Sequence, residues 1–381
     1  MARNKVEVVA LIRCVENLKV QQGNLMKQDY SLLGQSGKEA LASGLANPHW
    51  FRPMVDPKEI RELSIKQDLR PTIDALIWLG LLVISGSLAV YTFPSWWGLP
   101  FWLVYGVLYS SASDARWHEC GHSTAFKTPW KNELIYQIAS FFLLRSPYVW
   151  RASHVRHHTD TIIVGRDPEI QNMRPPDLIK QVLGIFGVIE LKVNLIRWFS
   201  HVRGKINAEE ATYLREKDFP KVFFVARVWG LIFFVTLASA LFLNSVVPLL
   251  LIVTPRLYGT WQMSMTGALQ HLGMAENVTD HRLNTRTVMM GPINRFLYLN
   301  MNFHVEHHMF TMIPYYQLPA LRELLKQDLP EAEPSIFAAY KRLLPVLWKQ
   351  LTDNKAVIVY DLPKNAVPYR DEVEHLLPHS L

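Results

Sequence analysis

Two long stretches without cationic side chains constrain the fold of this chain more than any other feature. Residues 71–115 contain no lysine or arginine, and residues 228–255 contain no charged side chain at all. Each stretch belongs to a wider apolar region with room for two bilayer-crossing helices, since one crossing takes about 20 apolar residues. Strongly charged segments alternate with these regions, so the mean hydropathy of the chain is only +0.05. This alternation is typical of membrane proteins.

The apolar regions predict an all-α integral membrane protein with four transmembrane helices in two hairpins. The expected spans are roughly residues 73–93, 97–115, 222–243 and 246–269. The hairpin turns, at 94–98 and 244–247, carry no charge, whereas the segments outside the hairpins hold nearly all lysines and arginines. Positive residues accumulate on the cytoplasmic side of membranes. We therefore expect both termini, and the segments between the hairpins, to be cytoplasmic.

This topology divides the chain into three parts. They are an N-terminal cytosolic lead-in over 1–70, a membrane domain over 71–325 and a C-terminal cytosolic segment over 326–381. Spaced apolar residues predict an amphipathic helix at Val6–Val20, and Val357–Tyr360 reads as a short strand. The net charge of +7 is attributed to lysines and arginines near lipid headgroups, not to nucleic acid binding.

Eight of the 14 histidines fall in three short boxes, all on the side expected to be cytoplasmic. The boxes read His118-Glu-Cys-Gly-His122, His154-Val-Arg-His157-His158 and His304-Val-Glu-His307-His308. Positions i, i+3 and i+4 share one face of a helix, so the imidazoles of a box converge. Histidine is the commonest metal ligand in proteins. Together the boxes predict a histidine-rich metal centre.

The first box also matches H-E-x-x-H, the zinc-protease signature in which the glutamate is the general base. A tetrahedral zinc ion takes four ligands, and eight histidines exceed that number. The protease interpretation would also leave the second and third boxes without a role. Eight or nine histidines suit two metal ions with four or five imidazoles each. A pair of iron ions could activate dioxygen, whereas zinc has no redox chemistry.

The series of three boxes, placed around two apolar hairpins, resembles the membrane fatty acid desaturase superfamily over roughly residues 70–325. The first box is similar to the H-E-C-G-H form found in some of its members. The resemblance implies a di-iron centre, four transmembrane helices under a cytosolic helical cap, and oxygen-dependent desaturation or hydroxylation of a lipid-like substrate. It implies ligand roles for the eight box histidines. It also implies an extra histidine after the fourth span, where His271 stands.

Two other functions compete with this one. The flanking segments 279–286 and 309–316 also resemble bacterial hydrocarbon or rhizopine oxygenases, which implies an oxygenase acting on a non-lipid small molecule. A third interpretation is a non-enzymatic membrane carrier of metal or haem, which would consume no oxygen.

Any such oxygen chemistry needs electrons, and the sequence holds no familiar site for an electron carrier. It has no His-Pro-Gly-Gly motif, no G-x-G-x-x-G loop and only two cysteines, Cys14 and Cys120. We expect a separate donor of the ferredoxin or cytochrome b5 type. Its expected docking surface consists of the basic residues Arg151, Arg156, Arg166, Lys192, Arg197, Arg203 and Lys205.

Metal-bound histidines usually donate their second ring N–H to a carboxylate or carbonyl oxygen. Six carboxylates of the chain are the candidates for this role. They are Asp114, Glu119, Asp160, Asp167, Asp280 and Glu306. His201 and His281, in polar and charged surroundings, are expected to be exposed histidines without a metal.

The charge distribution generates a prediction about topology. A reporter fused after Ser245, in the second hairpin turn, should report a non-cytoplasmic location. The turn has no lysine or arginine, the residues that favour the cytoplasmic side. The same reporter fused at residue 205 should report the cytoplasm. A cytoplasmic signal from both fusions would contradict the two-hairpin arrangement.

Overall fold

The computed structural model describes residues 28–46, 48–171 and 173–370, and these residues are predominantly helical. They form no named strand, only isolated bridges at Thr287–Phe303 and Val288–Glu333. The α-helices are α2 (Gln35–Ala42), α3 (Pro57–Leu63), α4 (Leu69–Thr92), α5 (Leu99–Tyr109), α6 (Ser111–Gly121), α7 (Pro129–Leu143), α8 (Pro147–Thr159), α9 (Leu178–Ile185), α10 (Val188–Val202), α11 (Phe219–Phe242), α12 (Val247–Ile252), α13 (Pro255–Tyr258), α14 (Trp261–His271), α15 (His281–Asn284), α16 (Pro292–Leu297), α17 (His304–Met309), α18 (Leu318–Leu325) and α19 (Ile336–Gln350). Short 3-10 helices are η1 (Trp96–Gly98), η2 (Glu210–Thr212), η3 (Glu216–Asp218) and η4 (Tyr315–Gln317). The helix expected at Val6–Val20 lies outside the described residues.

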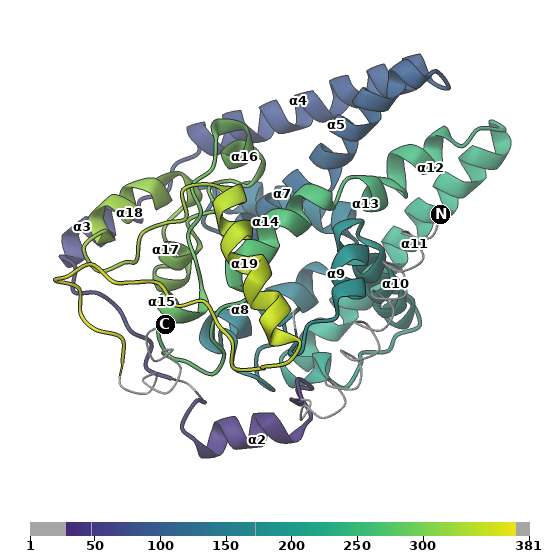
Figure 1. The fold of residues 1–381 in the computed structure, drawn as a ribbon. Coiled ribbons are helices and arrows are strands. Elements are labelled where there is room, and N and C mark those ends of the chain that lie inside the picture. Colours follow the sequence, from purple (N-terminus) through teal and green to yellow (C-terminus); the bar gives the residue numbers. More distant parts are fainter. Residues whose placement is uncertain (1–27, 47, 172, 371–381) are drawn as a thin grey trace, which may run out of the picture.

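Two of the described helices, α4 and α11, are long and apolar enough to cross a membrane. They coincide with the first and third predicted spans. Each presents large apolar side chains outward: Val83 on α4 is 66% exposed and Phe234 on α11 is 69% exposed. Side chains of this kind suit contact with lipid better than contact with water. Figure 1 shows α4 paired with α5, and α11 paired with α12, both pairs extending from the body of the molecule.

The second and fourth predicted spans are not single helices, which corrects the expectation of four uninterrupted ones. The segment at 97–115 divides at Ser110 into α5 and α6. The segment at 246–269 divides twice, giving α12, α13 and α14, and it contains the buried cation Arg256. Pro255 follows the first of these interruptions and Gly259 stands at the second. Proline and glycine both weaken a helix.

The interrupted segments meet, and their polar groups satisfy one another. The Ser110 hydroxyl donates to the carbonyl of Pro255 at 2.9 Å, and the Ser111 hydroxyl donates to that of Gly259 at 2.6 Å. A Cβ on Gly259 would stand only 1.9 Å from the Gly106 carbonyl oxygen, so the two backbones touch where glycine is required. Broken helices are tolerated in membrane proteins where such contacts replace the lost backbone bonds.

Arg256 completes this junction. Its guanidinium donates to the carbonyl oxygens of Ile252 and Phe141 and lies 5.4 Å from the Tyr109 ring centroid. The cation therefore ties the broken fourth segment to the end of α7.

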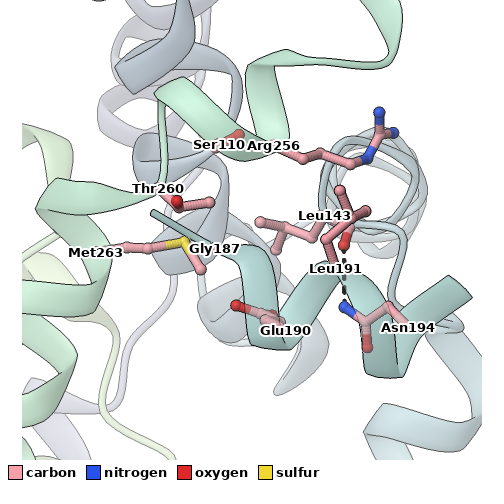
Figure 2. A pocket seen from close by; sticks show the side chains of 9 residues that line it. All are labelled: Ser110, Leu143, Gly187, Glu190, Leu191, Asn194, Arg256, Thr260 and Met263. Atoms are coloured by element: carbon pink, nitrogen blue, oxygen red, sulfur yellow. Dashed lines mark hydrogen bonds between the residues drawn. The ribbon is translucent and has the colours of Figure 1, made fainter. Parts of the chain in front are cut away.

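A small hollow lies beside this junction (Figure 2). Asn194 of α10 closes one side by donating to the Leu143 carbonyl at 3.3 Å. The lining residues are Ser110, Leu143, Gly187, Glu190, Leu191, Asn194, Arg256, Thr260 and Met263. None of them is a histidine, so this hollow is separate from the histidine boxes.

The C-terminal part packs on α14. Leu343 and Leu347 of α19 share a buried cluster with Leu269, and Ile358 joins it. The backbone N–H of Ile358 donates to the Gly273 carbonyl at 2.8 Å. Residues 357–360 form no strand, however, so that expectation is wrong: a single backbone contact to a loop replaces a strand ladder.

The charged surface also differs from expectation. His201 is not exposed: it is buried, with Nε2 3.0 Å from Glu210 Oε2. Four of the seven cations expected to receive an electron donor are already paired. These pairs are Arg151–Glu133, Arg156–Asp160, Arg166–Asp160 and Arg197–Glu210.

Candidate metal centre

The described structure brings the eight box histidines and His271 together inside the body of the molecule. The first box occupies the last turn of α6 and its C-cap, His122. The second occupies the last two turns of α8, and the third all but the end of α17. His271 is the last residue of α14. Because each box follows helical spacing, each helix aims its imidazoles inward as a set.

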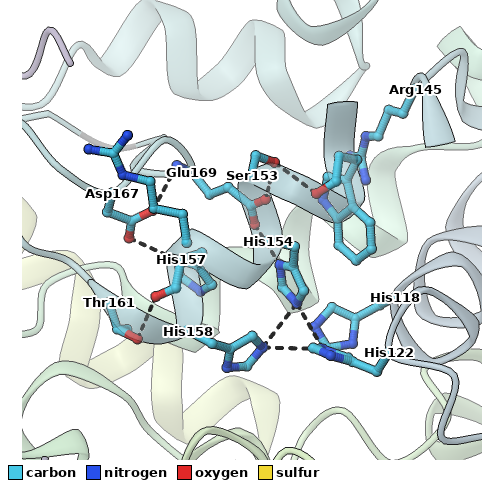
Figure 3. A network of polar contacts seen from close by, with 12 residues as sticks. His118, His122, Arg145, Ser153, His154, His157, His158, Thr161, Asp167 and Glu169 are labelled. Carbon is cyan, nitrogen blue, oxygen red and sulfur yellow. Dashed lines mark hydrogen bonds and ion pairs between the residues drawn. The ribbon is translucent and has the colours of Figure 1, made fainter. Parts of the chain in front are cut away.

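One group of ligand atoms comes from all three boxes. Its members are His118, His122, His154, His158 and His307, whose ligand atoms all lie within 4.8 Å of one another. The Nε2 atoms of His122, His154 and His158 lie 3.0 to 3.2 Å apart (Figure 3). The Nε2 atom of His307 lies 3.2 Å from that of His158.

A second group lies beside the first. The ligand atoms of His157, His271 and His308 lie within 4.8 Å of one another. His304 joins them, because its Nε2 is 3.1 Å from the Nε2 of His271 and 3.1 Å from that of His308. The rings of His158 and His308 have centroids 4.4 Å apart, so the two groups adjoin.

These spacings fit a metal ion in each group. Two imidazole nitrogens bound to one metal at about 2.1 Å, at right angles, lie about 3.0 Å apart. Both ring nitrogens of His118 are buried without a hydrogen-bond partner, a costly state that a bound cation would relieve. The donor set of the two groups is imidazole nitrogen alone, which suits iron, copper, zinc or nickel.

A single loop between α8 and α9 supports the second box from outside (Figure 3). The Nδ1 of His157 lies 2.8 Å from Asp167, and the Nδ1 of His154 lies 2.7 Å from Glu169. Asp167 also accepts from the backbone N–H of Ile162 at 2.8 Å, and Glu169 accepts from the Ser153 hydroxyl at 2.6 Å. The sequence predicted Asp167 as a carboxylate that orients a box histidine, whereas Glu169 is found in this role only in the structure. Each carboxylate holds one ring with its Nε2 toward the centre.

Other polar groups support the remaining histidines. The Nδ1 of His271 donates to the carbonyl of Asn284 at 2.8 Å, which leaves its Nε2 free to bind a metal. The hydroxyl of Thr161 lies 3.3 Å from the Nδ1 of His308. Glu119 is buried between the first and third boxes, with one oxygen 3.8 Å from His118 Nδ1 and 3.9 Å from His307 Nδ1. These two distances exceed a hydrogen bond.

Four carboxylates expected to support the histidines form ion pairs with arginine instead. The pairs are Asp114–Arg145, Asp160–Arg166, Asp280–Arg282 and Glu306–Arg322. Each of these carboxylates lies beside an arginine that belongs to no box. Its position in the sequence therefore does not predict whether it supports a histidine.

Burial sets the protonation of the centre. It lowers the pKa of His154, His158, His307 and His308 well below the usual value, and neighbouring imidazoles lower it further. These rings are therefore neutral at pH 7, with a lone pair available for a cation. Burial alone would also lower the pKa of His157, but the charge and the hydrogen bond of Asp167, together with the charge of Glu169, outweigh burial and the pKa is raised. Burial raises the pKa of Glu169 to about 7.

His281 corrects another expectation. It is 2% exposed, not an exposed loop histidine, and its ring centroid lies 5.1 Å from that of His308. It belongs to neither group of converging ligand atoms. Its other face is covered by Trp50, with centroids 4.1 Å apart and planes within 7°.

Comparison with known families agrees with this geometry. The sequence model named fatty acid desaturase matches residues 94–340, which is more than half of the 381 residues. The chain belongs to the fatty acid desaturase family. The matched region contains all nine histidines of the two groups.

Two curated relatives match shorter parts of the chain. An sn-1 acyl-lipid omega-3 desaturase (ferredoxin) of Nostoc sp. (strain 36) is 29% identical over 112 residues, which cover 29% of this chain and 30% of that protein. An sn-1 oleoyl-lipid 12-desaturase of Synechocystis sp. is 33% identical over 106 residues, which cover 28% of each. The chain thus aligns with less than a third of the length of either relative.

The supporting carboxylates generate a prediction about metal affinity. Asp167→Asn keeps the size of the side chain but removes the charge that fixes His157, so it should weaken metal binding by about 10- to 100-fold. Glu169→Gln should act in the same direction through His154. The measurement is iron retained per chain during dialysis against a graded chelator.

The matched control is Glu323→Gln on α18, whose side chain is 74% exposed and pairs with Lys326 instead of a histidine. It should retain iron as the unmodified protein does. Equal retention by all three variants would show that these carboxylates do not support metal ligands.

Proposed function

We propose that this protein is a membrane-bound, iron- and oxygen-dependent desaturase of acyl lipids. The observation that carries the proposal is the pair of adjoining imidazole groups within the region that matches the desaturase family. The names of the two curated relatives, both acyl-lipid desaturases, support a lipid acyl chain as the substrate.

In this proposal each group holds one iron ion. The first group supplies five ligands, and the second supplies four, including His271. The proposed ligands are His118, His122, His154, His158 and His307 for the first ion, and His157, His271, His304 and His308 for the second. Iron bound there would supply the redox chemistry that activates dioxygen.

The reaction removes one hydrogen from each of two adjacent carbons and forms a double bond between them. Those two hydrogens, two further electrons and two protons reduce dioxygen to two waters. The residues of the chain orient the imidazoles: Asp167 and Glu169 accept the outer N–H of His157 and His154. Each ring thereby turns its Nε2 toward the centre.

The apolar hairpins would let an acyl chain reach the metal centre from the bilayer. With residues 71–325 as the membrane domain, α4 and α11 lie in the bilayer and both termini and all boxes lie in the cytosol. The lead-in at 1–70 and the segment at 326–381 are the cytosolic parts of the chain on either side of the membrane domain. Exposed apolar residues on α4 and α11 support the membrane location.

The electrons come from a separate one-electron carrier. The word ferredoxin in the name of the first relative supports a ferredoxin, and a cytochrome b5 is the alternative donor. Desaturation and hydroxylation differ in how the carbon chain lies against the oxidant, so the product decides between a desaturase and an oxygenase.

The proposal predicts iron content and product together. Cells making the protein should contain an additional unsaturated acyl lipid, and the anaerobically purified chain should hold two irons. His271→Ala removes one of four ligands of the second group, so it should lower iron toward one per chain and abolish the product. Elemental analysis and lipid mass spectrometry measure the two effects.

His201→Gln is the control, because His201 pairs with Glu210 and lies outside both groups. It should keep two irons and full product. Hydroxylated lipid would indicate a hydroxylase, and an oxidised water-soluble compound would indicate the small-molecule oxygenase. Full zinc occupancy with undiminished activity, or iron without oxygen consumption, would contradict the proposal.

A further inference from the structure

An aromatic stack leads from the surface of the protein to the second histidine group. Trp50 lies flat on His281, with ring centroids 4.1 Å apart and planes within 7°. The ring of His281 lies 5.1 Å from that of His308. His281 and His308 are buried, whereas Trp50 is partly exposed. Two ring-to-ring steps therefore connect solvent with a proposed metal ligand.

Several contacts hold Trp50 in this position. Its Nε1 donates to the carbonyl of Thr159 at 3.0 Å, on the last turn of α8. The backbone N–H of Phe51 donates to the carbonyl of Thr279 at 2.9 Å, and the Arg282 guanidinium lies 3.6 Å from the Phe51 ring centroid. The segment around Trp50 is thus bound both to the end of α8 and to residues 279–282. These contacts hold the Trp50 ring against His281.

The proposed reaction gives this stack a use. The substrate supplies two of the four electrons that reduce dioxygen to two waters, so two must enter from a carrier protein. His308 is only 4% exposed, and a docked protein would reach Trp50 before it could reach that ligand.

We propose that a one-electron carrier protein docks over Trp50 and that its electrons pass through the Trp50–His281 stack to the metal held by the second group. This inference rests on the proposed function. Each transfer oxidises the reduced centre of the carrier by one electron and reduces one metal ion by one electron. Two transfers, with two protons from solvent, complete each turnover, and the stack itself is unchanged.

The surface around Trp50 suits an acidic carrier. Arg52 is exposed two residues away, and the Arg370 guanidinium donates to the carbonyl of His49 on the other side. Opposite charge guides association and fixes orientation more than it adds affinity. Most of the basic residues near α8 and α10, by comparison, are already paired with carboxylates.

The test compares Trp50→Leu, which removes the ring, with Trp50→Phe, which keeps one. The probe is a reduced plant-type ferredoxin, mixed anaerobically with the oxidised iron-loaded protein, and its oxidation is followed by stopped-flow absorbance. Trp50→Leu should slow this step by about tenfold or more, equivalent to about 1.4 kcal/mol in the barrier. Trp50→Phe should stay near the original rate. Reduction by dithionite, which needs no docking, should be equal in all variants.

Two controls separate the stack from other causes. Trp130→Leu alters a tryptophan that is 63% exposed on α7, and it should leave ferredoxin oxidation unchanged. Iron content should be equal in all variants. A second readout needs no iron: binding of oxidised ferredoxin should slow hydrogen exchange at residues 48–54 and 279–282.

An unchanged rate in Trp50→Leu, or protection confined to α8–α10, would overturn the inference. Failure of the proposed function would look different. It would be seen in the unmodified protein, as a chain that takes up no iron or makes no unsaturated lipid.

Discussion

The imidazoles of nine histidines, six of them buried and three partly exposed, must turn toward two points, and the rest of the molecule is arranged around that requirement. Burying a charged ring costs far more than burying a neutral one, which is why the pKa of most of these rings falls. Neutral rings still need their outer N–H satisfied. Asp167, Glu169 and the Asn284 carbonyl meet that need for three of them. The inner nitrogens are then 3.0 to 3.2 Å apart, as shared ligands of a cation would be.

The spacing of histidines within each box predicted which imidazoles would lie together. H-x-x-H-H places three rings on one helical face whatever the rest of the chain does, and α8 and α17 bear this out. Glu169 could not be found this way, because the loop before it turns back through Ile162 and Gly165, both at positive φ. His281 was judged from its charged sequence neighbours, Asp280 and Arg282, which in the structure neutralise each other and leave it buried.

The apolar pattern predicted where helices lie but not that two of them break. An apolar run has the same composition whether or not its helix is continuous. Pro255 and Gly259 are the residues in the sequence that could have indicated the breaks. The breaks are stabilised by contacts distant in sequence, such as Ser111 with Gly259 and Arg256 with Phe141. These breaks bring α6 and α14, which carry His118 and His271, against each other at the base of the hairpins.

The most direct test of this account is X-ray absorption at the iron K edge on the iron-loaded protein. Nine imidazoles shared by two ions predict a nitrogen first shell with about four to five imidazoles per iron, seen as strong outer-shell scattering from the rings. The described residues supply no cysteine sulfur to this shell, since Cys120 is buried on α6 and belongs to neither histidine group. A first shell made mainly of carboxylate or water oxygen, or one containing sulfur, would contradict the assignment of these histidines as the metal ligands.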